Sequence, residues 1–196
     1  MAGNIKKGTV IYVLKICAVL LLITMCTAFL LSFVNGITKD PIAKNEAAKK
    51  AKALSELFTD VAAPVSEKIE GEYEGEVNGF YLVKDGETII GYYADVSPVG
   101  FKGGVNLMVG LDTEGKVTGV TVLSHGETVG IGDKIEDKDF RSGFIGREGS
   151  LSYKKGAGAD EAGVIDGISG ATYSSKAVIN GVDLALKAYK TAKGGN

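Results

Sequence analysis

The sequence predicts an α+β fold, in which a single N-terminal transmembrane helix is followed by a small antiparallel-sheet domain that a C-terminal helix closes. Three features predict this fold: an uncharged apolar run at residues 16–34, alternating segments around two turns, and an apolar helical stripe near the end of the chain. Runs of strands followed by helices are typical of α+β domains. We expect three parts: an N-terminal segment with the transmembrane helix at 1–38, a linker helix at 39–64, and a ligand-binding domain at 65–196.

The apolar run at residues 16–34 is long enough to cross a membrane. As a helix it spans roughly 28 Å, close to the thickness of the hydrocarbon core. A secretory signal peptide is the alternative, because Lys6, Lys7 and Lys15 precede the run. Its apolar part is usually only about 7–15 residues long, and no clear Ala-x-Ala cleavage pattern follows here, so we expect a retained anchor. Lysines after the span outnumber those before it, so charge counting does not settle the orientation.

Residues 39–64 predict the linker helix. Asp40 is a good N-cap and Pro41 suits the first helical position. Apolar side chains then recur at helical spacing through residue 58, and Pro64 lies beyond the expected end. This helix would join the anchor to the domain.

The domain begins with two predicted hairpins. From residue 77 onward the apolar positions alternate on both sides of Asp85-Gly86, and a second pair of segments, 105–111 and 117–123, flanks a turn at 112–115. A short helix is predicted at 133–144, then a glycine-rich excursion at 146–163 with a short strand at 150–154. The final helix carries its apolar stripe from the first turn onward, at Val178, Val182, Ala185, Leu186 and Tyr189.

Composition excludes two classes of function. The chain has one histidine, His125, and its two cysteines, Cys17 and Cys26, lie in the predicted span on opposite helix faces, so a metal centre is not expected. A net charge of -2 with scattered lysines gives no basic stripe for nucleic acid.

The loop at residues 166–175 feeds directly into the final helix. A helix start leaves backbone N–H groups without partners and favours a phosphate beside it, and small residues let the backbone approach closely. Thr172 could therefore anchor a phosphate. The alternative is that a hydroxyl in this loop merely caps the helix, at Ser169, Thr172, Ser174 or Ser175.

Residues 166–172, Asp-Gly-Ile-Ser-Gly-Ala-Thr, resemble the covalent flavin-attachment motif of the FMN-binding domain family. That family includes the G subunit of Rnf-type ion-translocating oxidoreductases and the C subunit of the sodium-translocating NADH:quinone oxidoreductase. The resemblance implies that Thr172 carries FMN through a phosphoester bond, with Ser169, Gly170 and Ala171 beside it. It extends from the anchor to the last helix, and the chain length favours the Rnf G subunit.

The segment from His125 to Gly132 is similar to the family's Glu-Thr-Pro-Gly-x-Gly loop, which lines the flavin. Val129 replaces the proline, so we expect a loop that is less preorganised. By itself, the segment could be an ordinary glycine-rich turn. The resemblance implies flavin contacts for Glu127, Thr128, Gly130, Ile131 and Gly132.

Two further sets of residues are candidates for flavin contact. Residues 100–110 resemble the family segment that enters the third strand, and Leu107 and Met108 could offer an apolar surface to the ring, although strand residues more often belong to the core. The family places a flavin-contacting lysine where Lys154 or Lys155 stands, and we favour Lys154. A solvated lysine pair is the alternative.

The resemblance implies an electron-relay subunit of a membrane complex that moves electrons between ferredoxin and NAD. The subunit would not be catalytic alone, because the span holds no ionisable group that could move an ion. No general base is evident beside Thr172, so a separate flavin transferase is expected to attach FMN. Multi-span and iron-sulfur subunits would be the partners, with the N-terminus cytoplasmic and the FMN domain extracytoplasmic. The alternative is a membrane-tethered FMN-binding or sensory module that does not pass electrons.

Overall fold

The computed structural model describes residues 7–59, 61, 64–154 and 163–194. These form two compact units, Met1–Ala47 and Ala48–Asn196. Lys155, named above as a candidate, lies outside the described residues. The unit boundary falls inside the expected linker helix.

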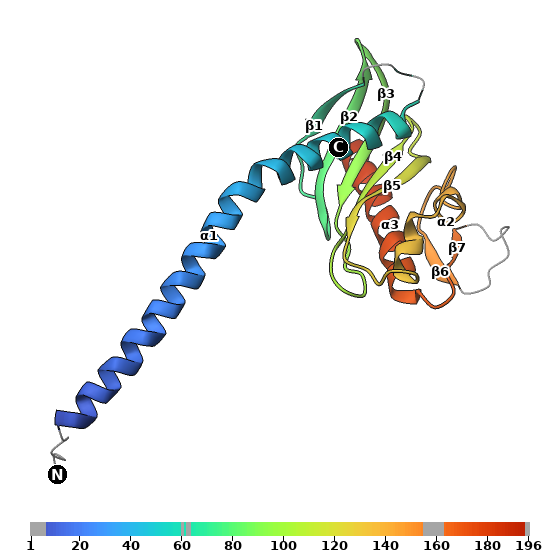
Figure 1. The fold of residues 1–196 in the computed structure, drawn as a ribbon. Coiled ribbons are helices and arrows are strands. Elements are labelled where there is room, and N and C mark those ends of the chain that lie inside the picture. The colour runs from blue at the N-terminus through green and yellow to red at the C-terminus, as the bar shows by residue number, and fades with distance from the viewer. Residues whose placement is uncertain (1–6, 60, 62–63, 155–162, 195–196) are drawn as a thin grey trace. The chain divides into compact units, whose positions relative to one another are not determined.

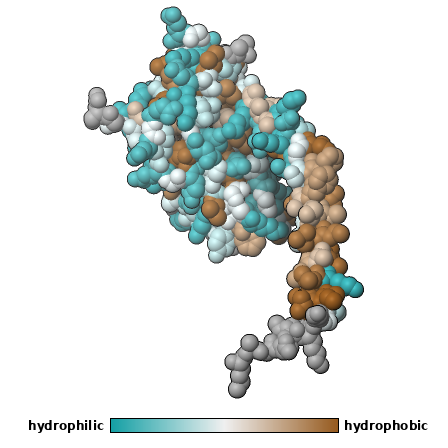
Figure 2. Space-filling view, turned by 90° about the vertical axis from the view of Figure 1, so that its left-hand side faces the viewer, coloured by the Kyte–Doolittle hydropathy of each residue, from teal (hydrophilic) through white to brown (hydrophobic). Residues whose placement is uncertain are grey.

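The first unit consists of helix α1 (Lys7–Leu57), which continues into the second unit. The expected start of a new helix at Pro41 is wrong, because Pro41 lies inside α1. A proline removes one N–H donor from the ladder, and the many remaining bonds of a long helix can carry it through. Among the described residues, one helical span, Val10–Leu57 of α1, is long and apolar enough to cross a membrane. Figure 2 shows apolar side chains along the N-terminal part of this helix.

The second unit is built around an antiparallel sheet of five strands in the order β1-β2-β3-β4-β5 (Figure 1). The two predicted hairpins are confirmed, with positive-φ glycines at Gly86 and Gly115 in their turns. The first strand was not predicted, because its side chains are almost all exposed and carry no apolar alternation. The strands are β1 (Val65–Ile69), β2 (Val77–Asp85), β3 (Thr88–Val96), β4 (Val105–Leu111) and β5 (Val117–His125).

Helix α3 (Thr172–Gly194) packs on one face of this sheet and forms the main core. Figure 1 shows α3 lying along the strands. The predicted stripe is confirmed in this core, where Val178, Val182 and Ala185 are fully buried and Leu186 nearly so, with Tyr189 packed at its edge.

The C-terminal end of α1, from residue 48 onward, covers the other face of the sheet. Ala53 and Phe58 pack there against buried residues of β2, β3 and β4. Glycines of the sheet make room for the helix end: a Cβ on Gly91 would lie 2.7 Å from the Phe58 ring, and one on Gly119 would lie 2.8 Å from Leu57. This end of the helix is therefore part of the domain's packing.

Shorter elements connect β5 to α3. The predicted helix at 133–144 is divided into a 3-10 turn, η1 (Gly132–Glu136), and α2 (Lys138–Ser142). The predicted short strand is β6 (Ser152–Lys154). It pairs in parallel with β7 (Val164–Asp166), which the sequence did not predict.

Candidate functional site

A cavity of ≈ 300 Å³ lies at the start of α3, between the loop that follows β5 and the loop that precedes the helix. We call it the α3 cavity. Seven of the twelve residues predicted for the site line it, together with three that were not predicted. The lining residues are Phe101, Glu127, Thr128, Ile131, Gly132, Gly170, Ala171, Thr172, Tyr173 and Ser174.

Thr172 is the first residue of α3, as the sequence predicted, and is partly buried at the cavity wall. Its hydroxyl lies 3.5 Å from the hydroxyl of Tyr153 on β6. Gly167 permits this approach, because a Cβ there would come within 2.0 Å of the Tyr153 ring. The preceding Gly170 adopts a φ of 83°, which side-chain-bearing residues rarely adopt.

The two neighbouring serines hold the segment around Thr172 through hydrogen bonds. Ser175 accepts a hydrogen bond from the Ile168 amide and donates one to the Ala171 carbonyl, each at 2.9 Å. Ser174 donates to Glu127. Among the hydroxyls that the sequence offered as caps, Ser175 bonds within the loop and Ser174 bonds to Glu127. Both Thr172 and Ser174 line the cavity.

Glu127 is the charged group at the centre of the cavity wall. The Glu127 residue as a whole is only 6% exposed. One carboxylate oxygen accepts hydrogen bonds from the Phe101 amide at 2.8 Å and the Lys102 amide at 3.2 Å, and the other accepts from Ser174 Oγ at 2.5 Å. The Glu127 amide in turn donates to His125 Nδ1 at 3.1 Å.

These contacts set the charge of Glu127. Burial acts to raise the pKa of its carboxyl, but the hydrogen bonds from Ser174, Lys102 and Phe101 and the nearby His125 together lower it below the usual 4.5. The carboxylate is therefore ionised at neutral pH. It gives the cavity one fixed negative charge held by the chain's own donors.

The loop after Glu127 is ordered by its backbone although it lacks the family's proline. Three successive amides, the last from Asp133, donate to the Thr128 carbonyl at 2.8–3.3 Å. Gly130 takes a φ of 81° and its amide donates to Asp133 Oδ2 at 2.9 Å. Val129, at the proline position, is 86% exposed, so the turn is held by hydrogen bonds and not by that side chain.

Three lining residues were not predicted from the sequence: Phe101, Tyr173 and Ser174. The rings of Phe101 and Tyr173 are exposed at the mouth of the cavity, with centroids 6.0 Å apart. Phe101 stands in the Gly-Phe-x-Gly segment and Tyr173 directly after Thr172. Both residues could have been predicted from the sequence, because each stands within or directly beside a segment that resembles a family motif.

Five predicted residues do not line the cavity. Leu107 and Met108 are buried in the two cores, on opposite faces of β4, so the expected contact of these side chains with a ring gives way to a role in packing. Successive side chains of a strand point to opposite faces, which separates the two. Lys154 is exposed at the end of β6, where its carbonyl accepts the Gly167 amide, and Ser169 and Gly130 are exposed loop residues next to the cavity.

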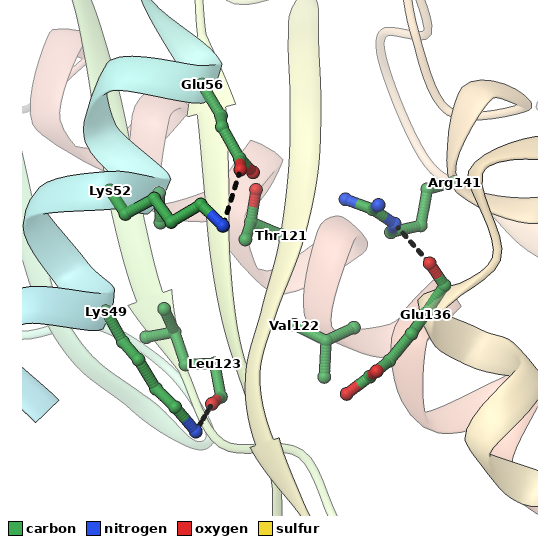
Figure 3. Close-up of a pocket in the computed structure, with 9 residues that line it drawn as sticks. Lys49, Lys52, Glu56, Thr121, Val122, Leu123, Glu136 and Arg141 are labelled. Atoms are coloured by element: carbon green, nitrogen blue, oxygen red, sulfur yellow. Dashed lines mark hydrogen bonds and ion pairs between the residues drawn. The ribbon is translucent and has the colours of Figure 1, made fainter. Parts of the chain in front are cut away.

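A second cavity, of ≈ 360 Å³, lies beside β5 at the sheet edge (Figure 3). We call it the β5 groove. Its long charged side chains bond to the edge strand or to each other: Lys49 donates to the Leu123 carbonyl at 3.2 Å, and Arg141 donates to the Val120 carbonyl at 3.0 Å. Such contacts protect a sheet edge from pairing with other chains. Its lining residues are Lys49, Lys52, Ala53, Glu56, Thr121, Val122, Leu123, Glu136 and Arg141.

Among the described residues, no group of three or more His, Cys, Asp or Glu side chains could hold a metal ion. The chemistry of the α3 cavity instead combines a hydroxyl at a helix start, glycines, one buried carboxylate and two aromatic rings. A helix start suits a phosphate, and an apolar mouth with rings suits a flat aromatic group.

Comparison with known proteins adds two family matches. Residues 100–187 match the FMN-binding domain family, and residues 13–57 match the RnfG N-terminal region. The first match contains every lining residue of the α3 cavity.

Relatives agree with these matches. The chain is 39% identical over 99 residues to the G subunit of the ion-translocating oxidoreductase complex of Aliivibrio fischeri, a match over 49% of this chain and 47% of that protein. It thus spans about half the length of that relative. It is 26% identical over 190 residues to the G subunit of the Na(+)-translocating ferredoxin:NAD(+) oxidoreductase complex of Acetobacterium woodii, over 94% of this chain and 91% of that protein.

Two solved structures share the fold. NqrC of Shewanella oneidensis matches with a TM-score of 0.52 at 21% identity, over 60% of this chain and 59% of that one. The C subunit of the Na(+)-translocating NADH-quinone reductase of Parabacteroides distasonis matches with a TM-score of 0.55 at 18% identity, over 76% of this chain and 92% of that one.

Proposed function

We propose that this chain, which belongs to the family of G subunits of Rnf-type ion-translocating oxidoreductases, carries FMN on Thr172 through a phosphoester bond. With this flavin the chain would relay electrons within a membrane complex. Its FMN-binding domain match supports the cofactor. The observation that carries the proposal is the position of Thr172, the first residue of α3, in the wall of the α3 cavity.

The residues of the α3 cavity fit a phosphate ester of a flavin. The first turn of α3 presents backbone N–H groups where the phosphate would lie, and Gly170 keeps that approach free of side chains. Gly132 lets the cavity wall pack closely, because a Cβ there would lie 2.8 Å from the Glu127 Cβ and 2.9 Å from Ser174 Oγ. Phe101, Tyr173 and Ile131 offer apolar surface at the mouth for the ring.

Within the part of the chain that the structure describes, the contact of the Thr172 hydroxyl does not supply an activating base. The described partner of its hydroxyl is the Tyr153 hydroxyl at 3.5 Å, and a phenol hydroxyl is a poor general base. A separate flavin transferase would therefore form the ester. When bound, FMN supplies one-electron and two-electron redox chemistry, while the chain holds it and sets the charge around it.

We place this activity in a membrane complex with multi-span and iron-sulfur subunits. The part of α1 before residue 35 would anchor the chain, with the N-terminus cytoplasmic and the FMN domain extracytoplasmic. Between residues 16 and 34 the anchor has no Asp, Glu, Lys, Arg or His side chain to carry an ion, so sodium or proton movement would belong to the partners. Electrons would pass between ferredoxin and NAD through the complex as a whole.

Intact mass of the full chain purified from its native host tests the attachment. We expect the mass to exceed that of the polypeptide by one FMN ester, the denatured chain to keep flavin fluorescence, and Thr172→Ala to lose both. Thr191→Ala is the matched control, because Thr191 is a threonine of the same helix that lies far from the cavity, in its last turns. A bare polypeptide mass in the presence of the transferase would refute covalent attachment.

Co-purification separates the relay from a membrane-tethered FMN-binding or sensory module. Recovery of the chain from native membranes with multi-span and iron-sulfur subunits, and reduction of its flavin by their electron donor, supports the relay. A flavin-bearing chain that purifies without redox partners and stays oxidised supports the sensory module.

A further inference from the structure

The carboxylate of Glu127 joins two segments of the chain that are distant in sequence. It accepts two amide hydrogen bonds from the turn between β3 and β4, 25 and 26 residues away, and a hydroxyl hydrogen bond from the first turn of α3, 47 residues away. Both of its oxygens are used in this way. Hydrogen bonds to a buried charge are among the stronger ones in proteins.

The packing around this carboxylate leaves little freedom. A Cβ on Gly100 would lie 2.4 Å from one carboxylate oxygen, and a Cβ on Gly132 would lie 2.8 Å from the Glu127 Cβ. The turn at 100–103 is closed by a hydrogen bond from the Gly100 amide to the Gly103 carbonyl at 2.7 Å. The Glu127 side chain is therefore packed closely against Gly100 on one side and Gly132 on the other.

The two segments joined by Glu127 each carry one ring of the cavity mouth. Phe101 donates its amide to the carboxylate, and Tyr173 precedes the Ser174 that donates its hydroxyl. Both residues are mostly exposed, at 62% and 67%, so burial does not hold their rings in place. Their separation of 6.0 Å depends on the backbones that Glu127 connects.

We infer that Glu127 is a positioning residue, whose carboxylate clamps the Phe101–Lys102 turn to the first turn of α3 and so holds Phe101 and Tyr173 together across the mouth of the α3 cavity. This positioning role deepens the proposed function, and its consequence for flavin binding rests on that proposed function. It gives the Glu127 side chain a positioning role in place of direct flavin contact, because three of the chain's own donors already bond to its carboxylate.

A tryptophan reporter tests the clamp without any flavin. The chain contains no tryptophan, so Phe101→Trp in the full-length Thr172→Ala chain places a single tryptophan on the turn, which is excited at long wavelength apart from the tyrosines. We measure acrylamide quenching and anisotropy of this tryptophan. Glu127→Ala should raise the population of chains in which the Phe101–Lys102 turn has moved away from α3 by about tenfold. The reason is that this change removes charge-assisted hydrogen bonds to three donors.

Matched variants identify the cause of the change. Glu127→Gln should fall between the parent and Glu127→Ala, because its amide oxygen can still accept from the Phe101 and Lys102 amides. Ser174→Ala should loosen the turn less than Glu127→Ala, and Glu87→Ala, which removes an exposed carboxylate in the turn between β2 and β3, should leave it unchanged. Equal quenching in the parent, Glu127→Ala and Ser174→Ala would overturn the clamp. If Glu127→Ala does not fold, Ser174→Ala and Glu127→Gln decide by the same measurement.

The chain with Thr172 intact gives the flavin readout. Glu127→Ala should make flavin fluorescence more sensitive to iodide at unchanged flavin content by intact mass. A loss of flavin with an unmoved tryptophan would overturn the clamp in favour of direct contact. Absence of flavin from the unmutated chain would refute the proposed function alone, since the tryptophan measurement does not need it.

Discussion

The α3 cavity and the β5 groove are similar in size but differ in how their polar groups are held. In the α3 cavity the polar groups are hydroxyls, backbone amides and one buried carboxylate, and they lie on loops shaped by glycines. In the β5 groove they are the ends of long, largely exposed charged side chains such as Lys52 and Glu56. The larger of the two cavities is thus the one with the less preorganised chemistry.

The difference teaches that volume does not mark the site. A fixed hydroxyl or amide loses little freedom when a ligand arrives, whereas a lysine must give up several rotatable bonds and its own hydration. In the β5 groove, Lys49 and Arg141 already donate hydrogen bonds to backbone carbonyls of β5. Four variants or conditions test this contrast, beginning with the largest expected effect.

Replacing Phe58 with alanine should weaken the packing of the end of α1, which carries one wall of the β5 groove, and leave the α3 cavity intact. Phe58 is 8% exposed and packs over Gly91, so its loss should lower the free energy of unfolding by about 3–5 kcal/mol. Thermal unfolding of the full chain in detergent, followed by circular dichroism, measures the change, with exposed Thr59→Ala as the control. Flavin content of the folded fraction should stay the same. An unchanged melting temperature would show that the end of α1 does not stabilise the sheet.

Replacing Gly100 with alanine should disturb the α3 cavity and leave the groove intact. The new methyl group would lie 2.4 Å from a Glu127 oxygen and 2.8 Å from Val105, so we expect a loss of about 1–3 kcal/mol in the free energy of unfolding. Gly104→Ala is the control, because a Cβ there meets nothing within 4 Å. The two variants are compared by thermal unfolding, and equal stability would contradict the close packing of Gly100 against Glu127.

Acid should weaken the α3 cavity through Glu127. Hydrogen bonds lower the pKa of Glu127 in the folded chain below the usual 4.5, so its contribution to stability is complete above the unfolded pKa and is lost as the pH falls through the folded pKa. The stability difference between the parent and Glu127→Gln should therefore shrink below about pH 4.5. Unfolding measured from neutral pH down through the folded pKa checks this. A constant difference would mean that the carboxylate charge is not what the cavity uses.

Replacing Lys52 with alanine should have the smallest effect. Its ammonium lies 3.8 Å from Glu56, and both side chains are exposed, so the pair should contribute less than about 0.5 kcal/mol. Flavin content, iodide quenching and the melting temperature should all match the parent. A drop in flavin content would show that the β5 groove takes part in cofactor binding, against the contrast drawn above.

Much of the fold followed from local patterns. The apolar run, the two hairpin turns and the stripe from Val178 to Tyr189 each depend on residues close together in the sequence, and the structure confirms them. The start of α3 at Thr172 also follows from local pattern, since the small residues before it end the loop there. Where the signal was weak, as in the exposed β1 and the short β7, the strands were missed.

The candidate site was predicted as two loops but not as one cavity. Glu127 and Thr172 were expected to serve the same ligand only because both resemble family motifs, and residues 107 and 108 were expected beside them on the same ground. The structure brings the two loops together and places Leu107 and Met108 in separate cores, because alternate strand residues face opposite sides. Burial on a given face depends on which helix covers it, which no single strand reveals.

The sequence by itself determined a helix long and apolar enough to cross a membrane, the hairpins, and a threonine at the start of an amphipathic helix, since each rests on the spacing of near neighbours. Only the tertiary structure decided that Ser174 serves Glu127, that Phe101 faces Tyr173, and that Tyr153 lies beside Thr172. The two hydrogen-bonded pairs lie 47 and 19 residues apart in the sequence, and they meet only because the sheet and α3 pack together. Local pattern sets where an element begins, and long-range packing sets which side chains meet.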